Sequence, residues 1–147
     1  MRILVSACLL GQKCRYDGNE RPCRAVLELA EEHELIPVCP ECLGGLPTPR
    51  CPSEIQNDGS VLMNNGADVT VAYQKGAEKT LQICMKTGCR IAILKEKSPS
   101  CGPSLIYDGS FTGHVIKGSG ITARKLRENG ITVLSELETD FLQKKRS

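Results

Sequence analysis

Four short apolar runs, separated by polar or amphipathic stretches, dominate the hydrophobic pattern of the chain. The first, RILVSA at residues 2–7, is apolar on consecutive positions rather than on alternate ones. A strand that reads this way is typical of a sheet buried on both faces. Three further runs of strand length lie at residues 35–39, 89–96 and 131–136. We expect all four to be strands of one sheet.

Helical periodicity fills the stretches between these runs. Residues 21–34 place apolar side chains at helical spacing opposite a glutamate-rich face. Residues 67–88 form the longest such stretch and end at Gly88, a residue typical of helix C-termini. Shorter helices are predicted at 121–130 and 137–144. The apolar side of the long helix is expected to consist of Val71, Ala77, Leu81, Cys84 and Met85.

This order of elements predicts the fold class. Strands that alternate with helices are connected by right-handed crossovers, which produce a parallel sheet. We therefore expect an α/β fold with a small, mainly parallel sheet of about four strands and helices on both faces. A chain of 147 residues fits one domain, so residues 1–147 are interpreted as a single domain.

Two long irregular segments interrupt the pattern. Residues 40–67 contain four prolines and many Gly, Asn and Asp residues, which favour turns. Residues 97–120 are similar, and only SVLMNN at 60–65 indicates a short strand. Loops of this length in a compact domain are usually functional or mobile.

Composition and charge exclude several classes of function. Aromatic residues make up only 3% of the chain, which disfavours the stacking platforms of single-strand nucleic-acid binders. A net charge of +2 gives no electrostatic reason for a duplex DNA or membrane partner. Nine cysteines, an odd number, cannot all pair. The pattern favours a reducing cytoplasm, where clustered thiols more often bind metal or catalyse reactions.

Several of these thiols follow predicted strands. Cys8 lies just past the first strand, Cys39 ends the second, and Cys101 is in the loop after the third. Ligands of open parallel sheets bind beyond the carboxyl ends of the strands, so the three thiols can converge there. Cys14, in the first of these loops, can join them. Cys84, on a helical apolar face, is expected to be a core residue.

A local motif, CPEC at residues 39–42, allows two other interpretations. It fits half of a zinc knuckle, although the nearest second pair, Cys84 and Cys89, begins inside a predicted helix. It also fits a thioredoxin-type redox pair, because Cys39 follows a strand. A zinc-held structural domain and a redox pair therefore stay open at this point.

A set of motifs spread along the chain resembles one known family. The motifs, in order, are ILVSACLLGQKCRYDG, LIPVCPE, GGLPTPR, ILKEKSPSCG, IYDGSFTG and GITARKLRENGI. Together they resemble the thiouracil desulfurase (TudS-like) family, formerly a domain of unknown function. The resemblance runs from residue 2 to about residue 136. It implies a Rossmann-like, three-layer fold that holds a [4Fe–4S] cluster on three cysteines.

The same resemblance implies the chemistry and its residues. The cluster ligands become Cys8, Cys39 and Cys101, with Cys14 able to replace one of them. The iron without a protein thiolate binds the sulfur of a thiolated nucleobase or nucleoside such as 2-thiouracil, and C=S is converted to C=O with release of hydrogen sulfide and no net electron transfer. Glu41 is implicated as the general acid/base, and we expect apolar neighbours around its carboxyl group.

Two serines beside Cys101 are further candidates. Ser98 and Ser100 flank Pro99, and either can hydrogen-bond the substrate or relay a proton; adjacency to Cys101 favours Ser100. The competing hypothesis is a non-catalytic iron–sulfur or zinc module that binds or senses a ligand. Colour, metal analysis and turnover distinguish these functions.

Overall fold

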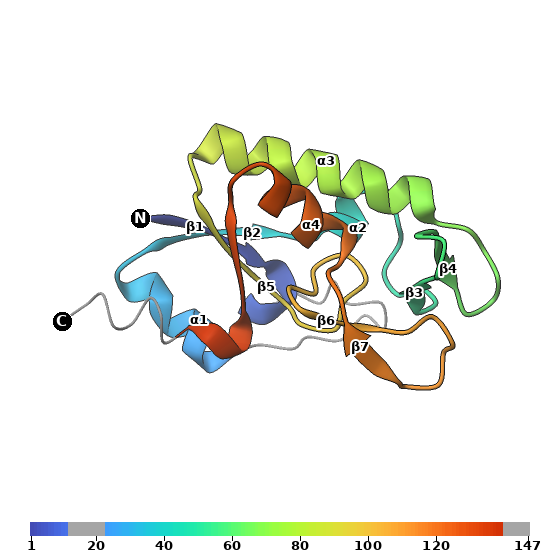
Figure 1. Ribbon diagram of the computed structural model, residues 1–147. Helices are drawn as coiled ribbons and strands as arrows, with labels where there is room; N and C mark the ends of the chain where they lie inside the picture. Colours follow the sequence, from blue (N-terminus) through green and yellow to red (C-terminus); the bar gives the residue numbers. More distant parts are fainter. Residues whose placement is uncertain (12–22, 140–147) are drawn as a thin grey trace.

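A parallel sheet of four strands forms the centre of the computed structural model, which describes residues 1–11 and 23–139. The strands are Arg2–Ser6 (β1), Glu34–Val38 (β2), Ile91–Leu94 (β5) and Thr132–Ser135 (β8). They lie in the order β2–β1–β5–β8, and all three ladders are parallel (Figure 1). Each strand falls within the run that predicted it, give or take one residue, and the predicted α/β class is confirmed.

Helices cover both faces of this sheet, as the alternation predicted. One core contains Leu4 and Ala92 of the strands together with residues of α3 (Thr70–Thr87) and α4 (Ile121–Glu128). The other contains Ile3 and Ile93 with residues of α1 (Arg24–Glu28) and of the short 3-10 helices η1 (Ala7–Leu10) and η2 (Leu29–Glu31). Successive strand residues point to opposite faces, and here both faces are apolar.

The buried face of α3 differs from the predicted one. Val71 and Met85 are 76% and 66% exposed, so the expectation that they face the core is wrong. The predicted Ala77 and Cys84 are buried and Leu81 packs against the core; Tyr73, Gly76 and Thr80 are buried with them. Sequence reasoning ranked residues by apolarity, whereas this helix turns its small residues toward a neighbouring backbone.

That neighbour is the four-residue helix α2 (Pro40–Leu43). A Cβ atom on Gly76 would lie 2.0 Å from the carbonyl oxygen of Pro40, and one on Gly44 would lie 2.0 Å from that of Ala72. Since real Cβ atoms do not approach an oxygen so closely, only glycine permits this packing. The contact fixes the segment that directly follows β2.

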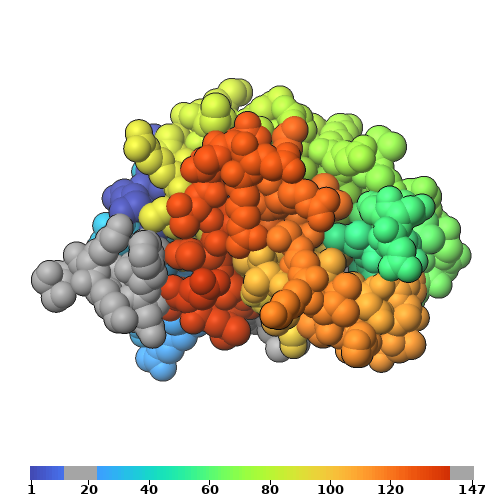
Figure 2. Space-filling view, in the orientation of Figure 1, coloured from blue at the N-terminus to red at the C-terminus, as the bar shows by residue number. Residues whose placement is uncertain are grey.

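Both irregular segments contain structure that the sequence pattern did not reveal. The first contains α2 and an antiparallel hairpin of β3 (Ser53–Ile55) and β4 (Val61–Met63), of which only β4 was expected. The second contains a hairpin of β6 (Leu105–Tyr107) and β7 (Val115–Lys117). The two hairpins lie side by side at one end of the molecule (Figures 1 and 2). Strands of three residues are too short to display a periodicity.

The end of the described chain is only partly as expected. Residues Glu136–Glu138 form a single 3-10 turn, η3, in place of the start of the predicted helix 137–144, and the rest of that helix lies outside the described residues. Cys14 also lies outside them. Within residues 1–11 and 23–139, no helix has both the length and the apolarity that a bilayer crossing requires.

Candidate active site

A cavity of about 570 Å³ opens beyond the carboxyl ends of β1, β2 and β5. From β1 the chain continues first to β2, on one side of β1 in the sheet, and later to β5, on the other side of β1. In open parallel sheets the crevice at such a reversal is the usual ligand site. The irregular segments 40–67 and 97–120 close the cavity on its other sides, so both contribute residues to its walls.

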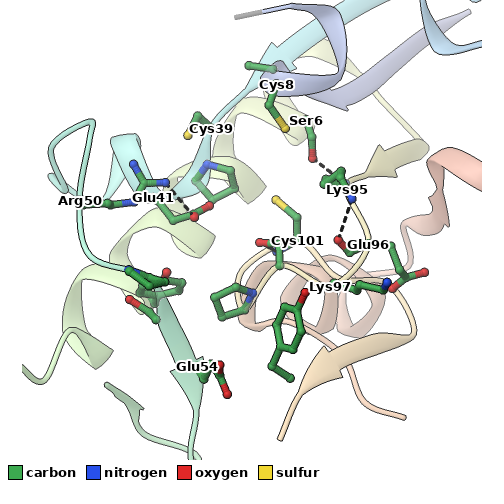
Figure 3. Close-up of a pocket in the computed structure, with 18 of the residues that line it drawn as sticks. Ser6, Cys8, Cys39, Glu41, Arg50, Glu54, Lys95, Glu96, Lys97 and Cys101 are labelled. Atoms are coloured by element: carbon green, nitrogen blue, oxygen red, sulfur yellow. Dashed lines mark hydrogen bonds and ion pairs between the residues drawn. The ribbon is translucent and has the colours of Figure 1, made fainter. Parts of the chain in front are cut away.

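Three thiols from three different elements line this cavity. Cys8 lies on η1 directly after β1, and Cys39 immediately precedes α2 at the end of β2. Cys101 lies in the loop after β5. Figure 3 shows the three sulfur atoms around a common space. The predicted convergence of Cys8, Cys39 and Cys101 on one crevice is therefore observed.

Cys101 is almost completely buried, with 4% of its surface exposed. Burial and the negative charge of Glu41 raise the pKa of its thiol far above the ordinary value, although hydrogen bonding to Ser6 and Ser100 opposes the shift. A thiol in this position stays protonated unless a metal replaces the proton. Soft thiolate ligands of this kind suit iron or zinc.

The three cavity thiols have the chemistry of ligands for an iron–sulfur cluster. In the described part of the chain, no three His, Cys, Asp or Glu side chains are close enough to share a single metal ion. The three cavity thiols instead border a common volume, on three separate elements. A polynuclear group held on three thiolates matches this arrangement.

The loop that carries Cys101 is held by Ser98. Its Oγ accepts hydrogen bonds from the backbone N–H groups of Ser100 (3.1 Å) and Cys101 (2.9 Å), and Ser98 also lines the cavity. Ser100 is fully buried and its hydroxyl bonds to that of Thr122 at 2.7 Å. Of the two serines singled out in the sequence, only Ser98 borders the cavity.

Glu41 lines the same cavity, one residue beyond the start of α2. Its carboxylate forms an ion pair with Arg50, with Nη2 and Oε2 2.9 Å apart, and the two side chains are 14% and 2% exposed. The expected apolar surroundings are therefore incomplete, because a buried guanidinium directly faces the carboxylate (Figure 3). Charge-assisted bonds of this kind fix orientation strongly.

The remaining described cysteines do not line the cavity. Cys42 is exposed, and its sulfur lies 3.6 Å from the hydroxyl of Thr48. Cys84 and Cys89 are buried in the core beneath α3, as predicted for Cys84. Burial raises the pKa of Cys84 to about 11, which keeps this thiol neutral. Cys42 also interacts with Cys39 through a side-chain hydrogen bond, so the two thiols of CPEC are neighbours, although only Cys39 lines the cavity.

Several residues besides the predicted ligands, Glu41 and Ser98 also border the cavity. Ser6 accepts a hydrogen bond from the N–H of Lys95 at 3.0 Å and so links β1 to the start of the Cys101 loop. Arg50 and Glu54 contribute buried charges, 2% exposed for the Arg50 side chain and 8% for Glu54. Lys97, with a left-handed φ of 66°, adds positive charge. No spacing rule connects these positions, because they come from β1, the segment before β3, β3 itself and the loop after β5.

Comparison with known proteins adds three findings. Residues 3–138 match the family described as 2-thiouracil desulfurase. The Bacillus subtilis (strain 168) protein YbbK, described as uncharacterized, is 42% identical over 145 residues, covering 92% of this chain and 96% of that protein. A solved structure described as the [4Fe-4S]-dependent thiouracil desulfidase TudS superimposes with a TM-score of 0.90 at 45% identity, covering 97% of this chain and 95% of that one.

Proposed function

The chain belongs to the 2-thiouracil desulfurase family, and from that premise we propose that it is a [4Fe–4S]-dependent desulfurase of thiolated nucleobases. Its reaction replaces the C=S group of a substrate such as 2-thiouracil by C=O. Water supplies the oxygen, the sulfur leaves as hydrogen sulfide, and no electrons are exchanged with an outside donor. The observation that carries the proposal is the convergence of three thiols on one cavity.

We assign Cys8, Cys39 and Cys101 as the ligands of the cluster. The fit is supported by three separate segments that each offer one thiol to the same cavity. When bound, a cluster held by three thiolates supplies an iron without a protein ligand, a Lewis acid for a soft thiocarbonyl sulfur. Cys14 stays the predicted substitute for one of the three.

Glu41 is assigned to proton transfer. Its carboxylate lies at the cavity wall, where it can accept a proton from the attacking water or exchange one with a ring nitrogen. The ion pair with Arg50 orients the carboxylate and holds it in one place, so it does not need to reorganise during the reaction. Arg50 acts through Glu41 and is a positioning residue.

Ser98 is assigned to substrate binding in preference to Ser100. A hydroxyl that accepts two backbone N–H bonds still has its own proton to donate, and Ser98 borders the cavity. Ser100 bonds to Thr122 in the core and to the Cys101 thiol, but it does not line the cavity. We therefore assign Ser100 to support of the Cys101 loop and Ser98, two residues before it, to contact with the substrate.

The decisive test is a turnover experiment on protein purified without oxygen. Metal analysis should give about four iron and four sulfide per chain, with a brown colour. Incubation with 2-thiouracil should then yield uracil and hydrogen sulfide in equal amounts. Zinc in place of iron would contradict the cofactor assignment. Iron–sulfur protein that leaves 2-thiouracil unchanged would favour a binding or sensing role.

A further inference from the structure

The aromatic side chains within residues 1–11 and 23–139 gather at the cavity. The sequence has three tyrosines, two phenylalanines and no tryptophan. Of these five residues, Tyr73, Tyr107 and Phe111 line the cavity. Neither the thiol ligands nor the proton transfer described above requires an aromatic ring. Their concentration at one site calls for a ligand with a flat, apolar face.

Phe111 is held in an unusual backbone conformation. It lies between β6 and β7 with a φ of 59°, a left-handed value that bulky residues rarely adopt. Such residues persist only where their surroundings enforce the conformation, and they concentrate at ligand sites. The ring is 36% exposed, although the residue lines the cavity. An aromatic ring left partly open at a cavity wall is available for contact with a ligand.

A buried acid enforces this conformation. Oε1 of Glu54 on β3 accepts hydrogen bonds from the backbone N–H groups of Gly109 (3.0 Å) and Phe111 (3.2 Å), and Glu54 is 8% exposed. The side-chain amide of Gln56 donates to the carbonyl oxygen of Gly109 at 3.2 Å. The β3–β4 hairpin thus holds the turn between β6 and β7 by hydrogen bonds, and these bonds fix the position of Phe111.

The three aromatic residues differ in how much of the ring they can offer. Tyr73 is only 2% exposed and packs within the protein. Tyr107 is half-buried at the end of β6, four residues before Phe111. Ring contact with a ligand therefore falls to Tyr107 and Phe111, both on the hairpin that follows the Cys101 loop. A ring stacked there keeps its polar edges for Glu41 and Ser98, which line the same cavity.

We propose that Tyr107 and Phe111 form a stacking wall that recognises the planar ring of the substrate, with Glu54 as the residue that positions Phe111. The wall selects heteroaromatic thiocarbonyl compounds over small non-aromatic ones such as thiourea. The inference rests on the proposed function for the identity of the reacting C=S group, but not for recognition of the ring. Stacking of a nucleobase on an aromatic side chain is independent of whether the base carries sulfur or oxygen.

Uracil is the probe that separates ring recognition from desulfuration. Its equilibrium binding to anaerobic, cluster-loaded protein is measured by calorimetry, next to KM and kcat for 2-thiouracil and thiourea. Phe111→Leu should weaken uracil binding and raise KM for 2-thiouracil about tenfold. The kcat for 2-thiouracil and the KM for thiourea should change little. Phe111→Tyr should restore binding. Ile116→Ala, on the same hairpin but outside the cavity lining, is the matched control.

Glu54→Gln tests positioning without removing the ring. It should weaken uracil binding severalfold while iron content stays unchanged, because a neutral amide holds the two N–H groups less strongly. Wild-type protein that does not bind uracil, or Phe111→Leu protein with unchanged uracil binding and KM, would overturn the stacking wall. Uracil binding that depends on Phe111 in a protein without desulfurase activity would support the wall and refute the proposed function instead.

Discussion

The two sides of the cavity are built by different means. The thiol side, Cys8, Cys39 and Cys101, follows β1, β2 and β5, and the central residues Ile3, Leu4 and Ile93 of β1 and β5 are fully buried. The hairpin side, Glu54, Tyr107 and Phe111, stands on three-residue strands tied by bonds from side chains to backbone. The sheet core anchors the strands before these thiols, and Ser98 holds the Cys101 loop by hydrogen bonds. The hairpin side depends on polar bonds between two short hairpins, and surface segments of that kind vary more readily.

The difference predicts separate consequences for each side. Changes on the thiol side should alter the amount of iron that the protein holds. Changes on the hairpin side should alter substrate affinity while the iron content stays constant, as the variants of Phe111 and Glu54 test. Variants of the thiol side and of the residues that support it test the comparison further. Their expected effects range from complete loss of iron and turnover to almost no change in stability.

Cys101→Ser should have the largest effect. The buried thiol cannot be replaced by a hydroxyl as a ligand for iron, so the protein should lose its visible absorbance, its iron and all turnover of 2-thiouracil. Iron and sulfide analysis of anaerobic protein measures this. Cys84→Ser is the matched control, because Cys84 is equally buried but lies in the core away from the cavity. A brown, active Cys101→Ser protein would contradict the ligand assignment.

Glu41→Gln should come next. The amide cannot exchange a proton, so kcat should fall by about 10²–10⁴-fold, the usual contribution of general acid–base catalysis. The iron content should stay the same, since Glu41 is not a thiol ligand. Glu34→Gln, at an exposed acid on β2 that pairs with Arg2, controls for loss of negative charge. Full activity of Glu41→Gln would exclude the assigned role.

Gly76→Ala tests the contact that carries Cys39. The new methyl group would overlap the carbonyl of Pro40, so α2 must shift, and we expect the free energy of unfolding to fall by about 1–3 kcal/mol. Iron content should fall as well, because Cys39 immediately precedes α2. Urea unfolding of the reduced protein measures the first effect. Lys75→Ala, at the exposed neighbouring position, should leave the free energy of unfolding and the iron content unchanged. Equal behaviour of the two variants would contradict a role for the contact between Gly76 and Pro40.

The smallest effect is expected at Val71. This side chain is 76% exposed, so Val71→Thr should change the free energy of unfolding by less than about 0.5 kcal/mol. The same urea experiment measures it. A decrease in the free energy of unfolding of more than about 1 kcal/mol would indicate that Val71 is buried, as the sequence pattern predicted for α3.

The regular part of the fold was predictable because its signals are local. Continuous apolar runs identified β1, β2, β5 and β8, and the alternation with helices identified a parallel sheet. The thiols after three of these strands then followed from one general rule about strand ends. The order of the motifs identified the family before the structure did so. The candidate ligands Cys8, Cys39 and Cys101 could therefore be predicted from the sequence, because their positions follow from those of the strands.

Most of the hairpin side was not predictable, and the buried face of α3 was predictable only in part, at Ala77 and Cys84. Glu54 lies 55 residues from Gly109 and 57 from Phe111 along the chain, so no local pattern links the acid to the turn that it holds. Strands of three residues are too short to show a hydrophobic periodicity. The contact of Gly76 with Pro40 requires that Gly76 has no side chain, and a hydrophobicity pattern does not reveal such a requirement.

Taken alone, the amino-acid sequence determined the sheet, the helices on its faces and the three thiols at its edge, because hydrophobic burial repeats with the period of each element. Tertiary structure alone decided which serine borders the cavity, that Arg50 faces Glu41, and that Tyr107 and Phe111 stand together at its wall. These contacts arise from polar bonds between distant segments, and the geometry of such bonds exists only after the core has packed.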